Sequence, residues 1–316
     1  MLAIKDSHGR PLYHIRVSIT QRCDLNCFYC HREGQDLATN EMTPAEISKI
    51  VKIASKFGVN KVKITGGEPL LRPDLSEIIH SISNIREIEE VSLVTNARIL
   101  THEKASELKH KGLTRININL PSHREETYRK IAGMELKPAL EGIEAAVKSG
   151  IFPVKLNMVI LKGLNDNEVY SMINFVKEFG AILQLIELEP LRMSEEMYKR
   201  HFLPLENIES EIARTARKVE TRKIMQNRSV YTLGNNAKVE FVRPVDNTEF
   251  CLHCTKIRLT SNGKLKPCLM SNDDLIDILG PIRVGETEDK LCELFLKAVR
   301  LRRPYHTAQK LRVRLK

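Results

Sequence analysis

The sequence predicts an α/β fold, namely an incomplete (β/α)6 barrel of the TIM type followed by a C-terminal α+β extension. Two observations predict it. Up to about residue 188, short runs rich in β-branched residues alternate with amphipathic helical stretches, which is typical of a parallel sheet with helical crossovers. Beyond that point the alternation stops. Six β/α units fall short of the eight that close a full barrel.

The elements of the barrel follow in order along the chain. The expected strands are His14–Thr20, Lys61–Thr65, Val91–Thr95, Thr114–Asn119, Phe152–Met158 and Leu183–Leu188. The helical patterns between them are Pro44–Phe57, Leu75–Ile82, His102–His110, Pro138–Ser149 and Glu168–Phe179. The first helical pattern has apolar Ile47, Ile50, Val51 and Ala54 at the spacing of one helix face. In such sheets the functional residues gather at the carboxyl ends of the strands.

The C-terminal region has a different pattern. Glu195–Lys223 is rich in charge and helical in its spacing, and Val230–Val242 reads as a hairpin around Gly234-Asn235-Asn236. A further helix is expected over Glu286–Arg303. We therefore divide the chain into a barrel over residues 1–225 and a C-terminal region over residues 226–316.

Composition limits the class of protein. The 316 residues are 42% hydrophobic and 28% charged, which is ordinary for a globular protein with a substantial core. No apolar run approaches the roughly 18–20 residues of a membrane helix, and the first residues contain no apolar signal core, so we expect a cytoplasmic protein. Fifty Lys and Arg against forty Asp and Glu give a net charge of +10, which favours an anionic partner, either a nucleotide or a nucleic acid.

Six of the seven cysteines form two triplets. Cys23, Cys27 and Cys30 make the first, Cys251, Cys254 and Cys268 make the second, and Cys292 stands alone. Disulfides are not expected in a reducing compartment. Buried structural cysteine is the alternative, but it does not predict triplets in polar, turn-like segments. Clustered cysteines therefore indicate two metal centres.

The spacing of the first triplet, with gaps of three and two residues, favours an iron–sulfur cluster. A zinc site takes four tetrahedral ligands, usually from paired C-x-x-C elements, and no second pair lies nearby in the sequence. Three thiolates on a tight loop suit a four-iron cubane that leaves one iron open for a small molecule.

Zinc stays an alternative at the second triplet, with His253 as a fourth ligand. However, a histidine inside a C-x-x-C loop points awkwardly for joining the thiolates on either side of it. Cys292 could also complete four ligands, but it lies on the apolar side of a helical pattern, which favours a place in the core.

The pattern C-x-x-x-C-x-x-C after a first strand, with Tyr29 before the last cysteine, resembles the radical S-adenosylmethionine (SAM) superfamily. Gly66-Gly67-Glu68-Pro69 resembles its GGE motif. The resemblance implies a [4Fe–4S] cluster whose open iron binds SAM and whose electron cleaves SAM to a 5′-deoxyadenosyl radical. It also implies that Tyr29, Gly67 and Asn119 lie beside SAM, and that Glu68 accepts from the methionine ammonium.

The segment from Phe250 to Leu269 closely resembles the C-terminal signature of the GTP 3′,8-cyclase family of molybdenum cofactor biosynthesis, and the wider resemblance covers residues 10–305. It implies a second [4Fe–4S] cluster that binds the GTP base at its open iron. The GTP-binding residues that it implies are Arg16, Lys63, Lys155, Lys256, Ile257 and Arg258. Fixed cations suit a triphosphate, and Arg forks bind phosphate oxygens especially well.

The chain departs from the family pattern at several positions. Lys63 and Lys256 replace arginines of the bacterial members, Val94 replaces a threonine near GTP, and Asn119 and Glu189 replace a serine and a methionine near SAM. The family typically ends in a Gly-Gly tail, whereas this chain ends Arg312-Val-Arg-Leu-Lys316. Cationic residues of this tail are the candidates to replace it.

The resemblance implies a lyase that converts GTP to (8S)-3′,8-cyclo-7,8-dihydroguanosine 5′-triphosphate. Such an enzyme needs a reducing electron donor, and its product passes to cyclic pyranopterin synthase. A radical SAM maturase acting on a peptide or protein, with an auxiliary cluster, is the alternative. Nucleic-acid binding through the basic residues Arg300, Arg302, Arg303, Lys310, Arg312, Arg314 and Lys316 is a third, but it lacks interleaved aromatics and leaves the cysteines unexplained.

Overall fold

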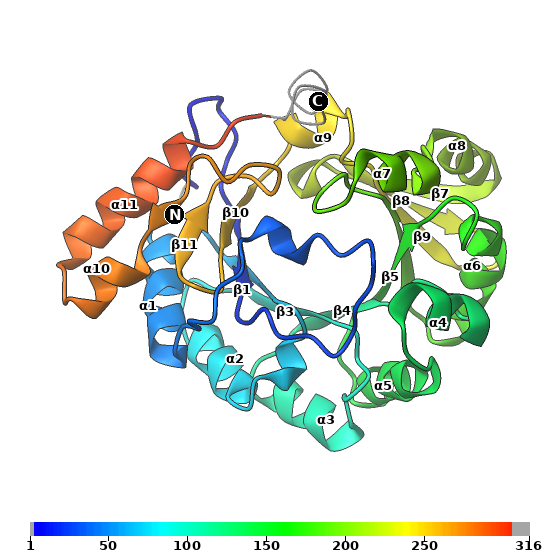
Figure 1. Cartoon of the computed structure of the whole chain (residues 1–316), viewed down its shortest axis with the longest axis horizontal. Helices are drawn as coiled ribbons and strands as arrows, with labels where there is room; N and C mark the ends of the chain where they lie inside the picture. Colours follow the sequence, from blue (N-terminus) through cyan, green and yellow to red (C-terminus); the bar gives the residue numbers. More distant parts are fainter. Residues whose placement is uncertain (1–2, 305–316) are drawn as a thin grey trace.

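The computed structural model describes residues 3–304. Six strands form the expected parallel barrel wall, paired in sequence order from β1 to β6. They are β1 His14–Ser18, β2 Lys61–Thr65, β3 Glu90–Thr95, β4 Arg115–Asn119, β5 Val154–Ile160 and β6 Ile182–Glu187. Figure 1 shows them curved around a central space, with the loop that follows β1 lying across it. The predicted (β/α)6 barrel is therefore confirmed.

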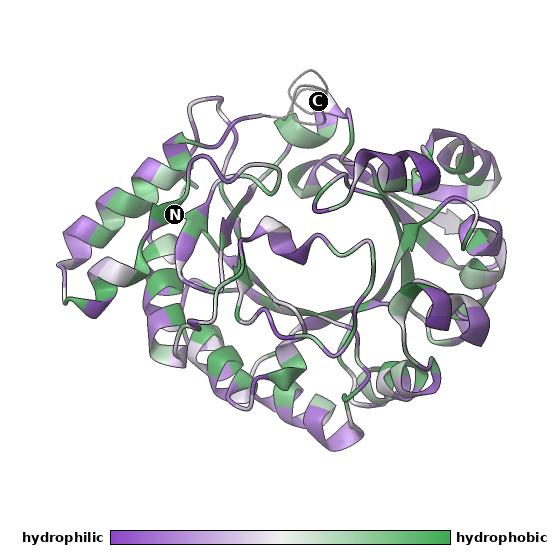
Figure 2. Cartoon of the chain, viewed as in Figure 1, coloured by the Kyte–Doolittle hydropathy of each residue, from purple (hydrophilic) through white to green (hydrophobic). Residues whose placement is uncertain are grey.

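Helices cover the outside of this wall. They are α1 Pro44–Ser55, α2 Leu75–Ser83, α3 His102–His110, α4 Glu125–Ala132, α5 Lys137–Lys148 and α6 Val169–Glu178, and short 3-10 turns occupy Arg32–Gly34, Pro69–Leu71, Asp166–Glu168 and Lys223–Met225. In Figure 2 the strands are mostly green and the outer faces of the helices are largely purple, as amphipathic packing requires. A capping box between Thr43 and Glu46 begins α1.

Helix α4 was not predicted. It has eight residues, of which only Tyr128, Ile131 and Ala132 are buried, so its apolar stripe is too short to stand out among charged residues. Gly133, at a φ of 78°, ends it in the left-handed conformation that glycine adopts most readily.

The chain after β6 adds helices and strands at both edges of the barrel. Its elements are α7 Glu195–His201, α8 Glu206–Thr215, β7 Ala216–Arg222, β8 Arg228–Leu233, β9 Lys238–Val242, α9 Thr248–Leu252, β10 Lys256–Leu259, β11 Lys264–Lys266, β12 Ile276–Asp277, α10 Leu279–Arg283 and α11 Glu288–Arg300. Strand β9 pairs in parallel with β6, and β10 pairs in parallel with β1. A single twelve-stranded sheet results among the described residues, with β7 and β12 at its edges.

One helical expectation is wrong at its end. Ala216–Arg222 falls inside the stretch predicted as helical, but it forms the edge strand β7, paired antiparallel with β8. Its side chains are mostly exposed and charged, so no apolar period distinguishes strand from helix, and pairing with β8 decides. The predicted hairpin is confirmed as β8 and β9.

Helix α11 closes the structure against the first helix of the barrel. Phe295 of α11 stacks on Phe57, which follows α1, with ring centroids 5.5 Å apart and planes 13° from parallel. Cys292 of the same helix packs against the core, as predicted. Within residues 3–304, no helix has the length and apolar character that crossing a membrane requires.

Candidate active site

One cavity of about 910 Å³ is walled by all six cysteines of the two triplets. The first triplet lies in the loop after the carboxyl end of β1, whereas Cys254 immediately precedes the amino end of β10. Since His14 and Lys256 are level with each other in these parallel strands, the two triplets lie at opposite ends of the barrel wall. A five-residue strand spans roughly 15 Å. The cavity therefore extends from one triplet to the other.

The thiols within each triplet lie so close together that a positively charged group beside them would stabilise their ionised form. Burial raises the pKa of Cys27 to about 12, and its fellow thiols Cys30 and Cys23 add to the rise. Burial and the neighbouring Cys254 and Cys268 likewise raise the pKa of Cys251 to about 12. Three thiolates so close together require positive charge beside them, and the irons of a cluster supply that charge.

No three histidine, cysteine, aspartate or glutamate side chains of the described chain gather tightly enough to hold a single metal ion. The thiolates of a cubane bind different irons, so they are spaced more widely than the ligands of one ion. Neither candidate fourth zinc ligand lines the cavity, because the His253 ring contacts the carbonyl of Glu249 and Cys292 lies on α11.

Buried arginines hold the loop of the second triplet. Arg10 Nη1 donates to the carbonyl of Cys251 at 2.9 Å, and Arg302 Nη2 donates to the carbonyl of Cys254 at 2.5 Å. Asp6 forms ion pairs with both arginines, at 2.8 and 3.5 Å. Although burial opposes it, the charge of Arg302 lowers the pKa of the Cys254 thiol. Sequence reasoning missed these contacts, since Arg10 lies 241 positions from Cys251 and Arg302 lies 48 positions from Cys254.

The glycines of the GGE motif are required by a close backbone contact. Gly67 N donates to the carbonyl of Thr20 at 2.8 Å, and a Cβ on Gly67 would lie only 2.2 Å from the carbonyl oxygen of Arg22. The absence of a side chain lets the motif pack on the loop that leads into the first triplet.

Glu68 lines the cavity and also holds neighbouring segments of the protein together. Its carboxylate accepts from the Thr95 hydroxyl and the Asn96 amide, both at 2.6 Å, and from the amide of Leu70 at 3.0 Å. Burial raises its pKa to about 7. It joins the ends of β2 and β3, and its contact with the methionine ammonium stays a prediction.

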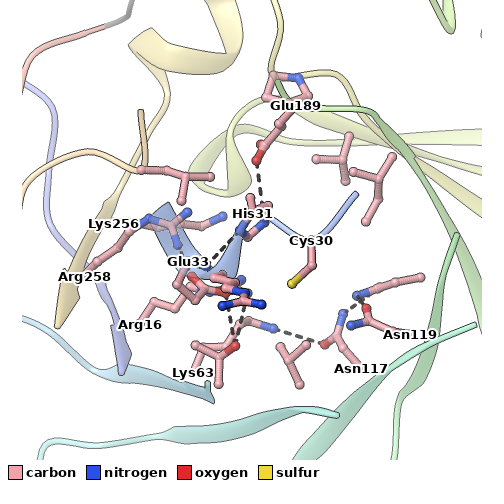
Figure 3. Close-up of a pocket in the computed structure, with 18 of the residues that line it drawn as sticks. Arg16, Cys30, His31, Glu33, Lys63, Asn117, Asn119, Glu189, Lys256 and Arg258 are labelled. Carbon is pink, nitrogen blue, oxygen red and sulfur yellow. Dashed lines mark hydrogen bonds and ion pairs between the residues drawn. The ribbon is translucent and has the colours of Figure 1, made fainter. Parts of the chain in front are cut away.

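The residues expected beside SAM line the cavity. Tyr29, Gly67 and Asn119 are all on its wall. Asn119 is the last member of a series of hydrogen bonds that joins side chains of three strands (Figure 3). Lys63 Nζ donates to Asn117 Oδ1 at 3.1 Å. Asn117 donates to Asn157 at 3.2 Å, and Asn157 donates to Asn119 at 3.3 Å. The amides thus connect the expected SAM region to a cation expected to bind GTP.

Arg16 and Arg258 face one carboxylate. Figure 3 shows Glu33 between them, and Arg258 Nη1 donates to it at 2.6 Å while Arg16 Nη2 donates to its other oxygen. Burial raises the pKa of Glu33, but the two arginines outweigh burial and hold it well below its usual range. The arginines are therefore fixed in orientation before any ligand arrives.

Lys63 and Lys256 line the cavity without a carboxylate partner within residues 3–304. Lys63 is hydrogen-bonded to Asn117, and Lys256 to Gln226 Oε1 at 2.5 Å. Burial lowers the pKa of both far below the usual lysine value, and neighbouring arginines lower it further. A lysine held in this way without a counter-ion favours its neutral form and regains its charge beside an anion, so this part of the wall is suited to bind an anion.

Two of the residues expected to bind GTP do not lie on the cavity wall. Lys155 is only 1% exposed and forms a buried ion pair with Glu240, and Ile257 is wholly buried in the core. Conversely, Arg115 and Arg228 line the cavity but were not singled out. Arg115 is the first residue of β4, an inward position that the strand's alternation offered as a signal.

Two further residues that depart from the family pattern also line the cavity. Val94 and Glu189 both line the cavity, and Glu189 lies 3.6 Å from His31, the residue after Cys30. The tail that we expect to replace the Gly-Gly terminus lies outside the described residues.

The partial barrel, the cysteine triplet after its first strand and the GGE loop define a radical SAM enzyme. The family model for the Radical SAM superfamily matches residues 17–176, and the model for Molybdenum Cofactor Synthesis C matches residues 181–308. The chain is 45% identical to proteins named "Probable GTP 3′,8-cyclase" from Methanococcus aeolicus and Pyrococcus abyssi, each match covering 96% of this chain and 99% of the relative. The chain belongs to the GTP 3′,8-cyclase family.

Solved structures support the fold. A structure of SuiB from Streptococcus suis bound to S-adenosylmethionine matches with a TM-score of 0.66 at 15% identity, over 86% of this chain and 65% of SuiB. A structure of anSMEcpe with bound AdoMet and the peptide Cp18Cys matches with a TM-score of 0.63 at 16% identity, over 89% of this chain and 80% of that protein. At these identities the likeness concerns the fold alone.

Proposed function

We propose that this chain is a lyase that converts GTP to (8S)-3′,8-cyclo-7,8-dihydroguanosine 5′-triphosphate. The observation that carries the proposal is the single cavity with a cysteine triplet at each end and cations between them. A cofactor at one triplet and a nucleotide at the other would share one cavity. The relatives named for this activity match over nearly their whole length, which supports the same reading.

The residues divide into two groups by position. Cys23, Cys27 and Cys30 would hold the [4Fe–4S] cluster that binds SAM, with Tyr29 and Asn119 on the wall beside it. Cys251, Cys254 and Cys268 would hold the second cluster, next to the nucleotide base. When bound and reduced, the first cluster and SAM supply a radical that removes a hydrogen atom from the substrate.

The protein's own part is to bind, orient and enclose the substrate. Arg16 and Arg258, already fixed by Glu33, present guanidinium forks to phosphate oxygens, and Lys63 and Lys256 add charge from the same wall. The walls of the long cavity would shield a reactive intermediate from part of the solvent.

Partners follow from this chemistry. The enzyme needs a reductant, and we propose that cyclic pyranopterin synthase consumes the product. Six free cysteines on one cavity suit a reducing compartment such as the cytoplasm. A nucleic-acid role is not favoured: Arg302 is buried against the second triplet and Arg303 lies 3.6 Å from Asp274, so these two arginines do not form a free basic surface.

The test is anaerobic turnover. Protein reconstituted with iron and sulfide is supplied with GTP, SAM and dithionite, and the products are separated and identified by mass spectrometry. We expect the cyclised triphosphate together with 5′-deoxyadenosine. Cleavage of SAM with no GTP-derived product, combined with modification of a cysteine-containing peptide, would establish the maturase instead.

A further inference from the structure

We propose that Arg115 and Arg228 form a phosphate subsite at the amino ends of the barrel strands and that they set the preference for a triphosphate. The proposal deepens the proposed function, and it rests on GTP being the substrate. It concerns residues that the sequence did not single out.

The subsite lies in a layer of basic side chains at the end of the barrel opposite the first triplet. Arg115, His14 and Lys256 are the first residues of β4, β1 and β10, so they lie at the end of the wall opposite the loop of Cys23, Cys27 and Cys30. All three line the cavity, together with Arg228 from β8. A ligand that reaches this layer must extend down the barrel from the cofactor end.

The two arginines are anchored on one side and unpaired on the other. Arg228 Nε donates to the carbonyl of Met225 at 2.8 Å, and its Nη1 lies 3.3 Å from Glu240. Arg115 Nε and Nη1 lie 3.4 and 3.5 Å from Glu90. Within the described chain the Nη2 of each arginine makes no hydrogen bond. A guanidinium held in this way keeps donors ready for an anion.

An unsatisfied buried group lies in the same layer. His14 Nδ1 is 2.8 Å from the Thr255 hydroxyl, which itself donates to the carbonyl of Ile224 at 3.0 Å. Thr255 therefore accepts from His14 Nδ1, and the other ring nitrogen is left without a partner although the residue is buried. Buried polar atoms are normally paired, and with the ring proton on Nδ1 the neutral ring leaves Nε2 as an acceptor, so this atom suits a donor such as a ligand hydroxyl or a water and not a phosphate oxygen.

Glu240 explains why Arg228 serves this role and Lys155 does not. The carboxylate is fully buried and binds Lys155 as well as Arg228. Lys155 is held in this ion pair and does not line the cavity. Arg228 contacts the same carboxylate and also lines the cavity. Arg222 also pairs with Glu240, at 3.6 Å, but it does not line the cavity, so it is a matched control.

The experiment measures equilibrium binding of GTP, GMP and inorganic tripolyphosphate to anaerobically reconstituted protein, without reductant. For Arg115→Gln and Arg228→Gln we expect a ten- to hundredfold loss of affinity for GTP, the range for losing a charge-assisted contact, and less than a threefold change for GMP. Arg222→Gln should bind all three ligands as the unaltered protein does. Iron content and circular dichroism establish that each variant is folded.

Equal losses for GTP and GMP in the arginine variants would overturn the proposal, as would unchanged GTP affinity. Tripolyphosphate separates this failure from that of the proposed function. If the unaltered protein binds tripolyphosphate, the arginine variants do not, and GTP is not cyclised, then the subsite holds and the assigned reaction is wrong. If GTP is cyclised but the arginine variants retain tripolyphosphate binding, the reaction holds and the subsite is wrong.

Discussion

The carboxylate of Glu33 accepts a hydrogen bond from Arg258 Nη1 at 2.6 Å, and this contact joins the loop of the first cysteine triplet to strand β10. Glu33 lies only three residues after Cys30. The same carboxylate binds Arg16 on β1. An anionic substrate that binds the two arginines must therefore share them with a carboxylate that the protein already provides.

Glu33→Gln should tighten GTP binding roughly tenfold, because it removes a like charge next to the triphosphate while keeping an acceptor for the arginines. The same substitution should lower the free energy of unfolding by about 3 kcal/mol, since two partly buried arginines lose their counter-ion. Equilibrium binding and urea unfolding measure the two effects. Weaker GTP binding would show instead that the charge of Glu33 positions the arginines for the substrate.

Acid should destabilise the protein through the same carboxylate. The pKa of Glu33 is lower in the folded chain than the ordinary value of 4.5, so its ionisation stabilises the fold above about pH 4.5, and this contribution is lost as the pH falls below that value. Glu240, whose pKa Arg228 and Lys155 lower despite burial, acts in the same direction. Urea unfolding at pH 7 and at about pH 3.5 should show a smaller difference for Glu33→Gln than for the unaltered chain.

Iron content should reveal two independent clusters. Anaerobically reconstituted protein should hold about eight irons per chain, because each triplet would hold a four-iron cubane. Cys27→Ala should abolish SAM cleavage, whereas Cys254→Ala should retain some cleavage and make no cyclised product. Stoichiometric zinc with negligible iron would contradict the scheme at both triplets.

Arg302→Gln should damage the second cluster alone. The substitution removes the charge and the fork that hold the Cys254 carbonyl, and it leaves Asp6 with one arginine fewer. We expect iron to fall toward about four per chain while SAM cleavage persists. Arg300→Gln, an exposed position at the end of α11 and two residues before Arg302, is the control. Full iron content in Arg302→Gln would mean that Arg10 alone is enough to hold this loop.

GTP binding should take up protons through Lys63. The pKa of Lys63 is well below its usual value in the ligand-free protein because of burial and neighbouring cations. A triphosphate favours the charged lysine and raises that pKa, so binding should weaken as the pH rises through the interval between the pKa of Lys63 in the free protein and its pKa in the complex. Calorimetry in buffers of different ionisation enthalpy measures the uptake. It should shrink in Lys63→Met and persist in Lys148→Met, an exposed control on α5.

The sequence was enough to determine the parts of the protein that depend on local patterns. The six parallel strands follow from β-rich runs between helical stretches, and the two cysteine triplets follow from spacing within single loops. The GGE motif follows the second strand, and its glycines are required where predicted, although by the backbone of Arg22. Such features can be predicted from the sequence because one short segment contains both the residue pattern and the residues that form the structure.

Only the tertiary structure decided which charges face the cavity. Lys155, Arg115 and Arg228 are equivalent as sequence, since each is a cation in or next to a β-rich run. A buried carboxylate from another strand, Glu240, removes Lys155 from the wall and leaves Arg228 on it. Burying a charge is costly unless it is paired, and the partner can come from anywhere along the chain. The allocation of cations between structure and substrate therefore depends on long-range pairing, which no local pattern contains.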